Sequence, residues 1–394
     1  MQKLTWRQLA AVGSMLFGLF FGAGNLIFPV AMGQLAGRNL WAAAAGFLIT
    51  GVGLPLLGVA ALGLSRESGL LALSSRVGRG YGLAFTCALY LTIGPFFAIP
   101  RCATVSYTVG IAPLAPGGGA ALGVFSLAFF AVVLFFSLRP GQILTWVGKV
   151  LNPLFLAFLA VLVLRALSAP LGQAAAVEPA GAYRAAPFAT GLLEGYNTMD
   201  ALAGLAFGIL VVQAIRRLGV RAPGDVAVST VCAGVFSSAL MAGIYLLVTL
   251  VGAQSRGRFA AAANGGEALA QIAAAYFGRA GALILAATVT VACLKTAVGL
   301  ITSCGETFVE IFPHGPSYRV WAVGFCLLSF LIANLGLDAI LAWSQPVLMA
   351  LYPLAIVLIL LTLAGPLYGD DRAVLRGGLG CTAAAAMLEF LRAL

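Results

Sequence analysis

The chain has 394 residues, of which 62% are apolar and only 9% are charged. Soluble domains are about half apolar and about a quarter charged, so this composition excludes a water-soluble globular protein. The formal net charge of +10 is spread over the loops, with no basic patch of the kind that binds nucleic acid. A single histidine, His314, excludes a His-cluster metal site and argues against a Ser-His-Asp hydrolase. We therefore expect a polytopic α-helical membrane protein that is not an enzyme.

A helix that spans a bilayer takes about 20 apolar residues. Eleven segments of the chain meet this requirement, at about 7–33, 39–64, 80–111, 119–138, 142–167, 188–215, 225–253, 280–312, 317–335, 337–364 and 373–393. The tenth segment is long for one span, so twelve spans are also compatible with the sequence. The first apolar run is too long for the core of a signal peptide, and we take it as the first span.

The basic residues predict the orientation of these spans. With the N-terminus in the cytoplasm, twelve Lys and Arg residues lie at cytoplasmic ends and seven at external ends. This excess favours a cytoplasmic N-terminus. The longest polar connections, 168–187 and 254–279, then lie outside, and the second is either a plain connector or a short helical lid.

The first predicted span contains Gly18, Gly22, Gly24 and Asn25 ahead of Pro29. Gly costs about 1 kcal/mol relative to Ala inside a helix, and Pro removes a backbone hydrogen bond. Unwound backbone at membrane depth is tolerated only where it is buried in protein or lines a cavity. Close helix packing explains the glycines alone but not the amide beside them, so we predict a broken helix at a binding site.

The sixth predicted span carries a second polar interruption, formed by Glu194, Gly195, Tyr196, Asn197, Thr198 and Asp200. Charges at this depth are costly and usually functional. The two interruptions lie five spans apart, as expected for an inverted repeat of five plus five helices with a substrate between discontinuous helices. The N-terminus of a half-helix attracts an anion such as an amino-acid carboxylate. Carbonyl groups at the opposing ends suit an ammonium group or Na⁺.

Several runs of the sequence resemble the signatures of bacterial branched-chain amino acid:cation symporters. The matching runs are residues 21–29, 46–50, 93–101, 194–200 and 292–300. The resemblance implies a LeuT-type fold in the bacterial cytoplasmic membrane, and uptake of leucine, isoleucine and valine coupled to Na⁺ or H⁺, with no other cofactor. It also implies one transporter domain over 1–394, with repeats at about 7–167 and 188–364 and an extra helix at about 373–393. The family usually has twelve spans, one more than we count here.

Carried over to this sequence, the resemblance gives two sets of site residues. The substrate-binding set is Gly22, Ala23, Gly24 and Asn25 from the first break, and Gly195, Tyr196, Asn197 and Thr198 from the second. The cation or coupling set is Gly18, Phe21, Ala292, Lys295 and Thr296, between the first and eighth spans.

Lys295 departs from the family, in which this position is commonly small or carries a hydroxyl. An ammonium group here either occupies the place of Na⁺, and then loads and releases a proton because burial disfavours its charge, or reaches an aqueous cavity or a carboxylate. The sequence leaves these alternatives open.

Arg101 lies within the third span and is a candidate gate if it pairs with Glu194 or Asp200. The alternative is that it holds the third helix against a neighbour. Phe20, Phe21, Phe97 and Met199 are candidates for the apolar wall around an aliphatic side chain. A channel and an intramembrane enzyme are the competing functions, but the paired breaks favour an occluding site and the chain lacks a credible nucleophile and base.

Overall fold

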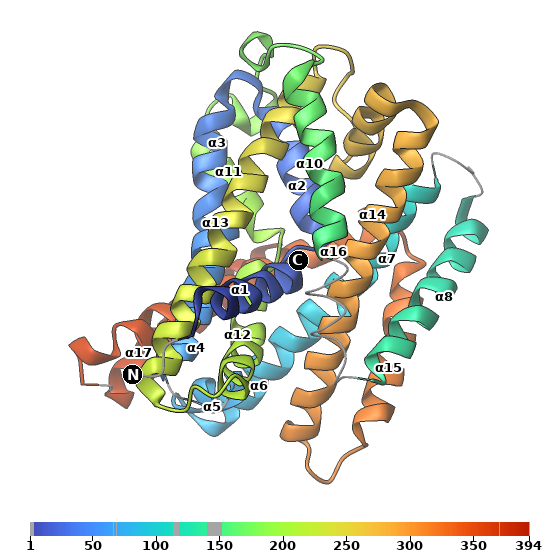
Figure 1. The fold of residues 1–394 in the computed structure, drawn as a ribbon. Coiled ribbons are helices and arrows are strands. Elements are labelled where there is room, and N and C mark those ends of the chain that lie inside the picture. Colours follow the sequence, from blue (N-terminus) through green and yellow to red (C-terminus); the bar gives the residue numbers. More distant parts are fainter. Residues whose placement is uncertain are drawn as a thin grey trace.

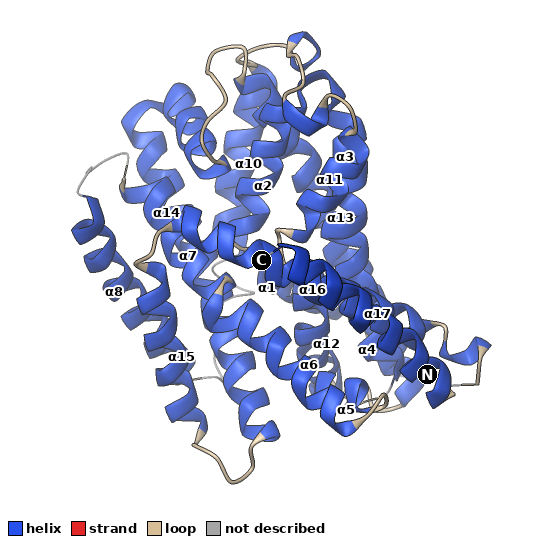
Figure 2. Cartoon of the chain, turned by 180° about the vertical axis from the view of Figure 1, so that it is seen from behind, coloured by secondary structure: helices blue, strands red, loops and turns tan. Residues whose placement is uncertain are grey.

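A computed structural model describes residues 4–65, 67, 69–112, 118–139, 152–369 and 371–393. Every regular element in this part of the chain is a helix (Figures 1 and 2). The α-helices are α1 (Trp6–Phe20), α2 (Ala23–Ala36), α3 (Leu40–Leu48), α4 (Leu54–Ser65), α5 (Leu70–Ser75), α6 (Arg79–Leu91), α7 (Ala98–Ser106), α8 (Gly118–Ser137), α10 (Asn152–Ser168), α11 (Pro187–Tyr196), α12 (Asp200–Arg217), α13 (Pro223–Ser255), α14 (Gly265–Ile311), α15 (Tyr318–Ala333), α16 (Leu337–Leu363) and α17 (Arg372–Ala393).

Shorter helical elements link several of them. Three are π-helical: η2 (Ile49–Gly53), η3 (Thr92–Phe96) and η4 (Tyr107–Ile111). Four are 3-10 helices: η1 (Gly37–Asn39), η7 (Ala174–Ala176), η8 (Gly181–Tyr183) and η9 (Gly365–Leu367). The expected all-helical fold with discontinuous first and sixth spans is confirmed, because α1 and α2 are separate helices, as are α11 and α12.

Within the described residues, six helical stretches are long and apolar enough to cross a membrane, and the bent pair α11 and α12 makes a seventh. Two further apolar helices, Leu159–Ser168 and Tyr318–Ala333, are shorter than a full span. Residues 142–151 of the predicted fifth span lie outside the described residues. The total of eleven spans therefore stays a prediction.

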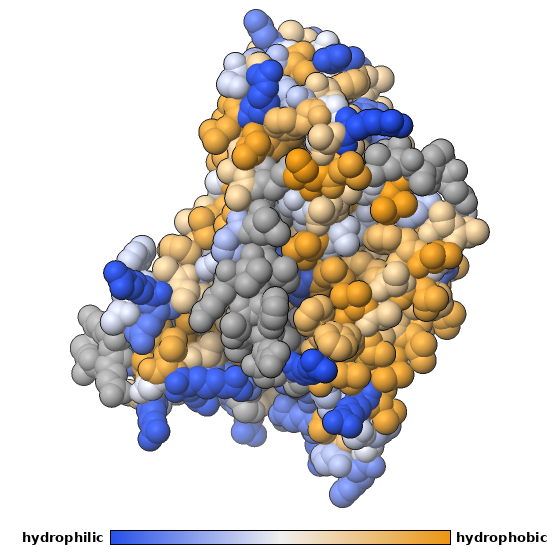
Figure 3. Space-filling view, turned by 45° about the vertical axis from the view of Figure 1, so that its right-hand side comes forward, coloured by the Kyte–Doolittle hydropathy of each residue, from blue (hydrophilic) through white to orange (hydrophobic). Residues whose placement is uncertain are grey.

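The surface has the polarity of a multi-pass membrane protein. Apolar side chains cover the flank formed by α8 and α15, and hydrophilic residues gather at the two ends of the molecule (Figure 3). On this flank Val124 is 72% exposed and Leu331 is 64% exposed. Exposed apolar patches of this extent are unusual on soluble monomers, whereas acyl chains of a bilayer cover them without cost.

Glycines allow the helices around the first break to approach closely. α13 packs against α2, α1 and α4. A Cβ atom on Gly33 of α2 would lie 2.0 Å from the carbonyl oxygen of Thr249, and one on Gly252 of α13 would lie 2.4 Å from that of Val30. Small residues commonly bring membrane helices together in this way, and here they hold α2 rigidly beside α13.

The connection at 254–279 is helical over its second half rather than a plain connector. α14 begins at Gly265, with Asn264 as its N-cap, and turns sharply at Gly278, where φ is 59°. Positive φ is strained for residues with a Cβ but not for glycine. The part of α14 before this turn packs against α2, since a Cβ on Gly265 would lie 1.8 Å from the carbonyl oxygen of Ile27.

Candidate functional site

The first break lies at Phe21 and Gly22, whose backbone is extended rather than helical. Figure 1 shows α1 and α2 leaving this point in different directions. The Asn25 side chain caps the new helix, because its Oδ1 accepts a hydrogen bond from the Gly22 N–H at 3.0 Å. The other N–H groups of the first turn of α2 have no partner inside the helix. Pro29 has no N–H, so the carbonyl of Asn25 also loses its helical partner.

Asn25 also joins the two broken helices directly. Its Nδ2 donates to Asp200 Oδ2 at 2.5 Å and to the hydroxyl of Tyr245. The Tyr245 hydroxyl in turn donates to Asp200 Oδ2 at 2.9 Å. All three side chains are buried. The first turn of α2, the first residue of α12 and the middle of α13 therefore form one hydrogen-bonded unit.

The second break spans Asn197, Thr198 and Met199, and the two helices it joins are bent by 44°. Met199 has φ of 64°, which makes it the one non-glycine residue with positive φ in the described part of the chain. This left-handed conformation costs about 1–2 kcal/mol for a residue with a Cβ. Such strain persists only where the surroundings hold it in place, which is common at ligand sites.

Side chains from other spans hold the carbonyl groups of this break. The Tyr352 hydroxyl donates to the carbonyl of Tyr196 at 2.8 Å, and the two rings stack 4.3 Å apart. The guanidinium of Arg101 donates to the carbonyl oxygen of Asn197 at 2.6 Å and to that of Thr198 at 3.3 Å. The carbonyls exposed by unwinding therefore already have partners within the protein.

The third span is interrupted as well, a feature that we did not predict. The backbone is non-helical at Gly94, between α6 and α7. A Cβ on Gly94 would lie 2.6 Å from the Cys304 sulfur, so only glycine fits without a shift. The adjacent Pro95 and the later Pro100 are the sequence features that could have indicated this interruption. Arg101, in α7 after this interruption, reaches the second break.

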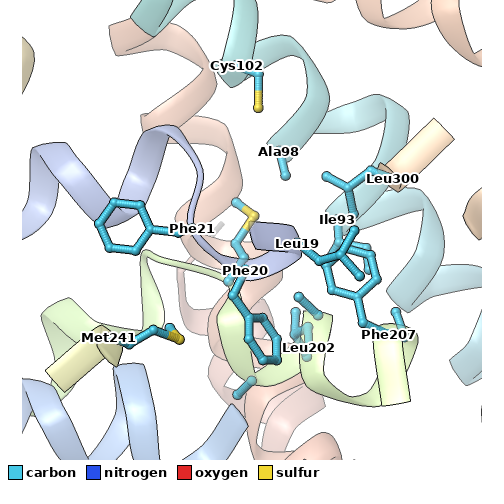
Figure 4. Close-up of a cluster of buried hydrophobic side chains, with 14 of the residues drawn as sticks. Leu19, Phe20, Phe21, Ile93, Ala98, Cys102, Leu202, Phe207, Met241 and Leu300 are labelled. Atoms are coloured by element: carbon cyan, nitrogen blue, oxygen red, sulfur yellow. The ribbon is translucent and has the colours of Figure 1, made fainter. Parts of the chain in front are cut away.

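A small cavity lies between the two breaks. Its polar lining consists of Gly22, Gly24, Asn25, Arg101, Thr198, Asp200 and Thr296. Its apolar lining consists of Leu19, Phe20, Ile93, Ala98, Cys102, Met199, Ala203, Phe207 and Leu300. In Figure 4, Leu19, Ile93 and Leu300 gather on one side of Phe20, with Phe207 below them.

The structure separates the predicted substrate-binding residues into two groups. Gly22, Gly24, Asn25 and Thr198 line the cavity, and Ala23 is the first residue of α2. Gly195, Tyr196 and Asn197 are not among the lining residues.

The glycine at the second break is a packing residue. A Cβ on Gly195 would lie 2.0 Å from the hydroxyl oxygen of Thr50 and 2.9 Å from the carbonyl oxygen of Phe47. Gly195 thus lets α11 pack closely against the second span. Of the four predicted wall residues, Phe20 and Met199 line the cavity, whereas the rings of Phe21 and Phe97 do not.

The coupling set lies along the contact between α1 and α14. Thr296 lines the cavity, and a Cβ on Gly22 would lie 2.9 Å from its hydroxyl oxygen. That hydroxyl is buried and has no hydrogen-bond partner. Lys295 is only 1% exposed, and its Nζ lies 5.7 Å from the centre of the Phe17 ring. Gly18 and Ala292 are buried beside them.

One of the two alternatives for Arg101, a salt bridge with Glu194 or Asp200, is not formed. The guanidinium binds backbone carbonyls instead, and Asp200 is occupied by Asn25 and Tyr245. Glu194 accepts a hydrogen bond from the Asn197 amide at 3.3 Å. The one ion pair in the described ranges is that of Arg38 and Glu178, far from the cavity. Of the two alternatives for Arg101, its contacts with backbone carbonyls match the one in which it holds the third helix against a neighbour.

Sequence reasoning missed several residues of the site, among them Tyr245, Tyr352 and Phe207. Tyr245 and Tyr352 are single aromatic residues in apolar spans, and no local signal distinguishes them from core residues. Phe207 lies seven residues after Asp200, so that helical spacing from that carboxylate identifies it as a lining candidate.

The sequence of the chain matches that of known transporters over almost its whole length. Residues 6–394 match the family model of branched-chain amino acid transport proteins. The chain belongs to this family. It is 58% identical to the branched-chain amino acid permease BrnQ of Lactobacillus delbrueckii subsp. lactis, over 93% of this chain and 83% of that protein. It is 46% identical to the branched-chain amino acid transport system 2 carrier protein of Pseudomonas aeruginosa, over 92% of this chain and 82% of the carrier.

Solved structures show the same fold. The structure of MhsT in complex with L-phenylalanine aligns with a TM-score of 0.60 at 16% identity and covers 100% of both chains. The nucleobase-cation-symport-1 family transporter Mhp1 aligns with a TM-score of 0.60 at 14% identity and covers 98% of this chain and 91% of its own. The expected LeuT-type fold is thereby confirmed, and so is a transport function rather than an enzymatic one.

Proposed function

We propose that this family member imports leucine, isoleucine and valine across the bacterial cytoplasmic membrane by alternating access, with its N-terminus in the cytoplasm. The observation that carries the proposal is the cavity between the two breaks, with polar groups at the broken helices and an aliphatic and aromatic lining elsewhere. The names of its relatives support branched-chain substrates. The excess of basic residues at the predicted cytoplasmic ends supports the orientation.

The polar lining suits the two charges of an amino acid. The N-terminal turn of α2, at Gly24 and Asn25, offers N–H groups and a positive helix end to the α-carboxylate. The carboxylate of Asp200 is the only formal negative charge among the lining residues and suits the α-ammonium group. A branched aliphatic side chain then contacts Ile93 and Phe207, where burial is favourable at about 25 cal/mol per Å².

We propose further that a cation bound between α1 and α14 drives uptake. The unpartnered Thr296 hydroxyl beside Gly22 is the supporting observation, because a buried hydroxyl without a partner is costly. With Na⁺ as the coupling ion, the ligands would be this hydroxyl and the backbone carbonyls of Gly18, Phe21 and Ala292. Oxygen donors of this type suit a hard cation. Bound there, the ion would supply positive charge beside the substrate site.

A second coupling arrangement is supported by Lys295. Its ammonium is buried against α1 at Phe17, on the same helix contact as the proposed ion site. In this arrangement Lys295 takes the place of Na⁺, and a proton gradient or exchange drives transport.

Leucine uptake into proteoliposomes distinguishes these possibilities. Separate inward gradients of Na⁺ and H⁺ are applied to wild type, Thr296→Val and Lys295→Thr. A Na⁺ site at Thr296 predicts Na⁺-driven uptake that Thr296→Val abolishes. Lysine coupling predicts H⁺-driven uptake in wild type and its loss in Lys295→Thr. Saturable leucine uptake that needs neither gradient would favour an exchange mechanism. Non-saturating conductance would refute the transporter mechanism itself.

A further inference from the structure

Arg101 is a buried cation that lines the cavity between the two breaks. It is 4% exposed and lies in α7, within the third span. Its guanidinium packs on the first turn of α2, because a Cβ on Gly24 would lie 2.9 Å from Nη2 and 3.3 Å from Cζ. The N-terminus of a helix carries a partial positive charge. The guanidinium of Arg101 and the positive end of α2 are therefore neighbours in the wall of the cavity.

Within the part of the chain that the structure describes, Arg101 forms no salt bridge with a carboxylate. Asp200, the acidic residue that shares the cavity, accepts its hydrogen bonds from Asn25 and Tyr245. The two Nη atoms of Arg101 donate to the carbonyls of Asn197 and Thr198. Its Nε is buried and has no hydrogen-bond partner. One donor of the guanidinium is thus unused, although Asp200 lines the same cavity.

We propose that Arg101 binds the α-carboxylate of the substrate, together with the N-terminus of α2. This inference rests on the proposed function and identifies the side chain that recognises the α-carboxylate of the amino acid. A carboxylate in the cavity, beside both the guanidinium and the first turn of α2, is attracted by both and supplies the missing acceptor for Nε. Arg101 would then also keep its bonds to the second break, so that binding the substrate adds a link between the first, third and sixth spans.

The proposal predicts that the site requires a charged carboxylate because of Arg101. Breaking one buried, hydrogen-bonded charge pair lowers affinity by about 30-fold or more, which corresponds to about 2 kcal/mol. Leucine and leucinamide differ only in that the carboxylate of one is a neutral amide in the other. We therefore expect wild type to bind leucine about 30-fold more tightly than leucinamide.

The test measures both ligands in wild type and in Arg101→Gln. Dissociation constants come from the ligand-induced rise in melting temperature of the purified full-length protein in detergent. Arg101→Gln is expected to lose most of its leucine affinity and to change little toward leucinamide, so that the ratio between the two ligands falls severalfold, with the preference that remains coming from the N-terminus of α2. If Arg101 only positions the second break, both ligands lose affinity by the same factor and the ratio is unchanged, which overturns the proposal.

Gly24→Ala serves as a second variant if Arg101→Gln does not fold. The added methyl group displaces the guanidinium by contact with Nη2 but retains the charge and the helix. The ratio of leucine to leucinamide affinity is expected to fall in this variant too, and an unchanged ratio contradicts the proposal. A wild-type ratio near one also contradicts it. Failure of wild type to bind leucine at all instead refutes the proposed function, so the two failures are distinguishable.

Discussion

The Asn25→Ala substitution tests whether the first break is held in its binding geometry by one side chain. It removes three hydrogen bonds: from the Gly22 N–H, to Asp200 and to Tyr245. A hydrogen bond to a charged group contributes about 1.5–3 kcal/mol, and a neutral one contributes about 0.5–1.5 kcal/mol. Measured values between membrane helices lie toward the lower ends. We take about 3 kcal/mol for the three together.

This energy is expected to appear as a loss of leucine affinity. Without the side chain, the Gly22 N–H and the Asp200 carboxylate lose their shared partner, and the break adopts other geometries. Affinity then falls in proportion to the fraction of molecules in the binding geometry. A cost of about 3 kcal/mol corresponds to about a 100-fold increase in the dissociation constant.

The assay is leucine binding to purified protein, with leucine uptake in proteoliposomes as the functional readout. Asn264→Ala is the matched control, because the Asn264 side chain also caps a helix, accepting from the Glu267 N–H at 3.0 Å, but lies away from the cavity. We expect the control to retain wild-type affinity. Unchanged binding in Asn25→Ala would refute the reasoning, since it would mean that the three bonds do not set the geometry of the site.

Three further predictions follow from contacts of single residues. Gly195→Ala is expected to lower the melting temperature and the yield of folded protein, because its Cβ would lie 2.0 Å from the Thr50 hydroxyl oxygen, whereas Gly243→Ala, with no atom within 4 Å, is expected to be neutral. Phe207→Ala is expected to enlarge the apolar part of the cavity, so that phenylalanine competes with leucine for uptake; continued exclusion of phenylalanine would place the boundary of the cavity elsewhere. Tyr352→Phe is expected to weaken leucine binding by about 5-fold through loss of about 1 kcal/mol at the second break, and equal affinity would show that the hydroxyl is dispensable.

The sequence predicts the positions of the breaks well because their cause is local. Three glycines, an amide and a proline disfavour a continuous helix at the first break whatever packs around them. The polar run before Asp200 does the same in the sixth span. Both interruptions therefore occur where the composition of the segment places them.

The direction of each side chain is harder to predict from the sequence, because it depends on contacts between spans that are distant in the chain. Gly195 has the same composition signal as Gly22, yet it packs against Thr50 while Gly22 lines the cavity. Tyr245 comes from a span whose sequence reads as a regular apolar helix. Arg101 bonds to peptide carbonyls of the second break, which belongs to another span.

The two breaks are therefore not equivalent, although the sequence suggests a matched pair. At the second break, Arg101 and Tyr352 already satisfy the carbonyls, and the strained backbone of Met199 is held by these contacts. At the first break, the cap comes from Asn25 of the same helix, and the other N–H groups of the first turn of α2 have no partner within the helix. The unwound backbone that is free to bind a ligand belongs to the first break, whereas the second break acts as a scaffold that places Asp200 and Arg101 opposite it. A substrate that bridges these groups links α2, which is open to ligand, with the second break, which is already fixed. Binding at this site can in this way alter the packing between the first and sixth spans.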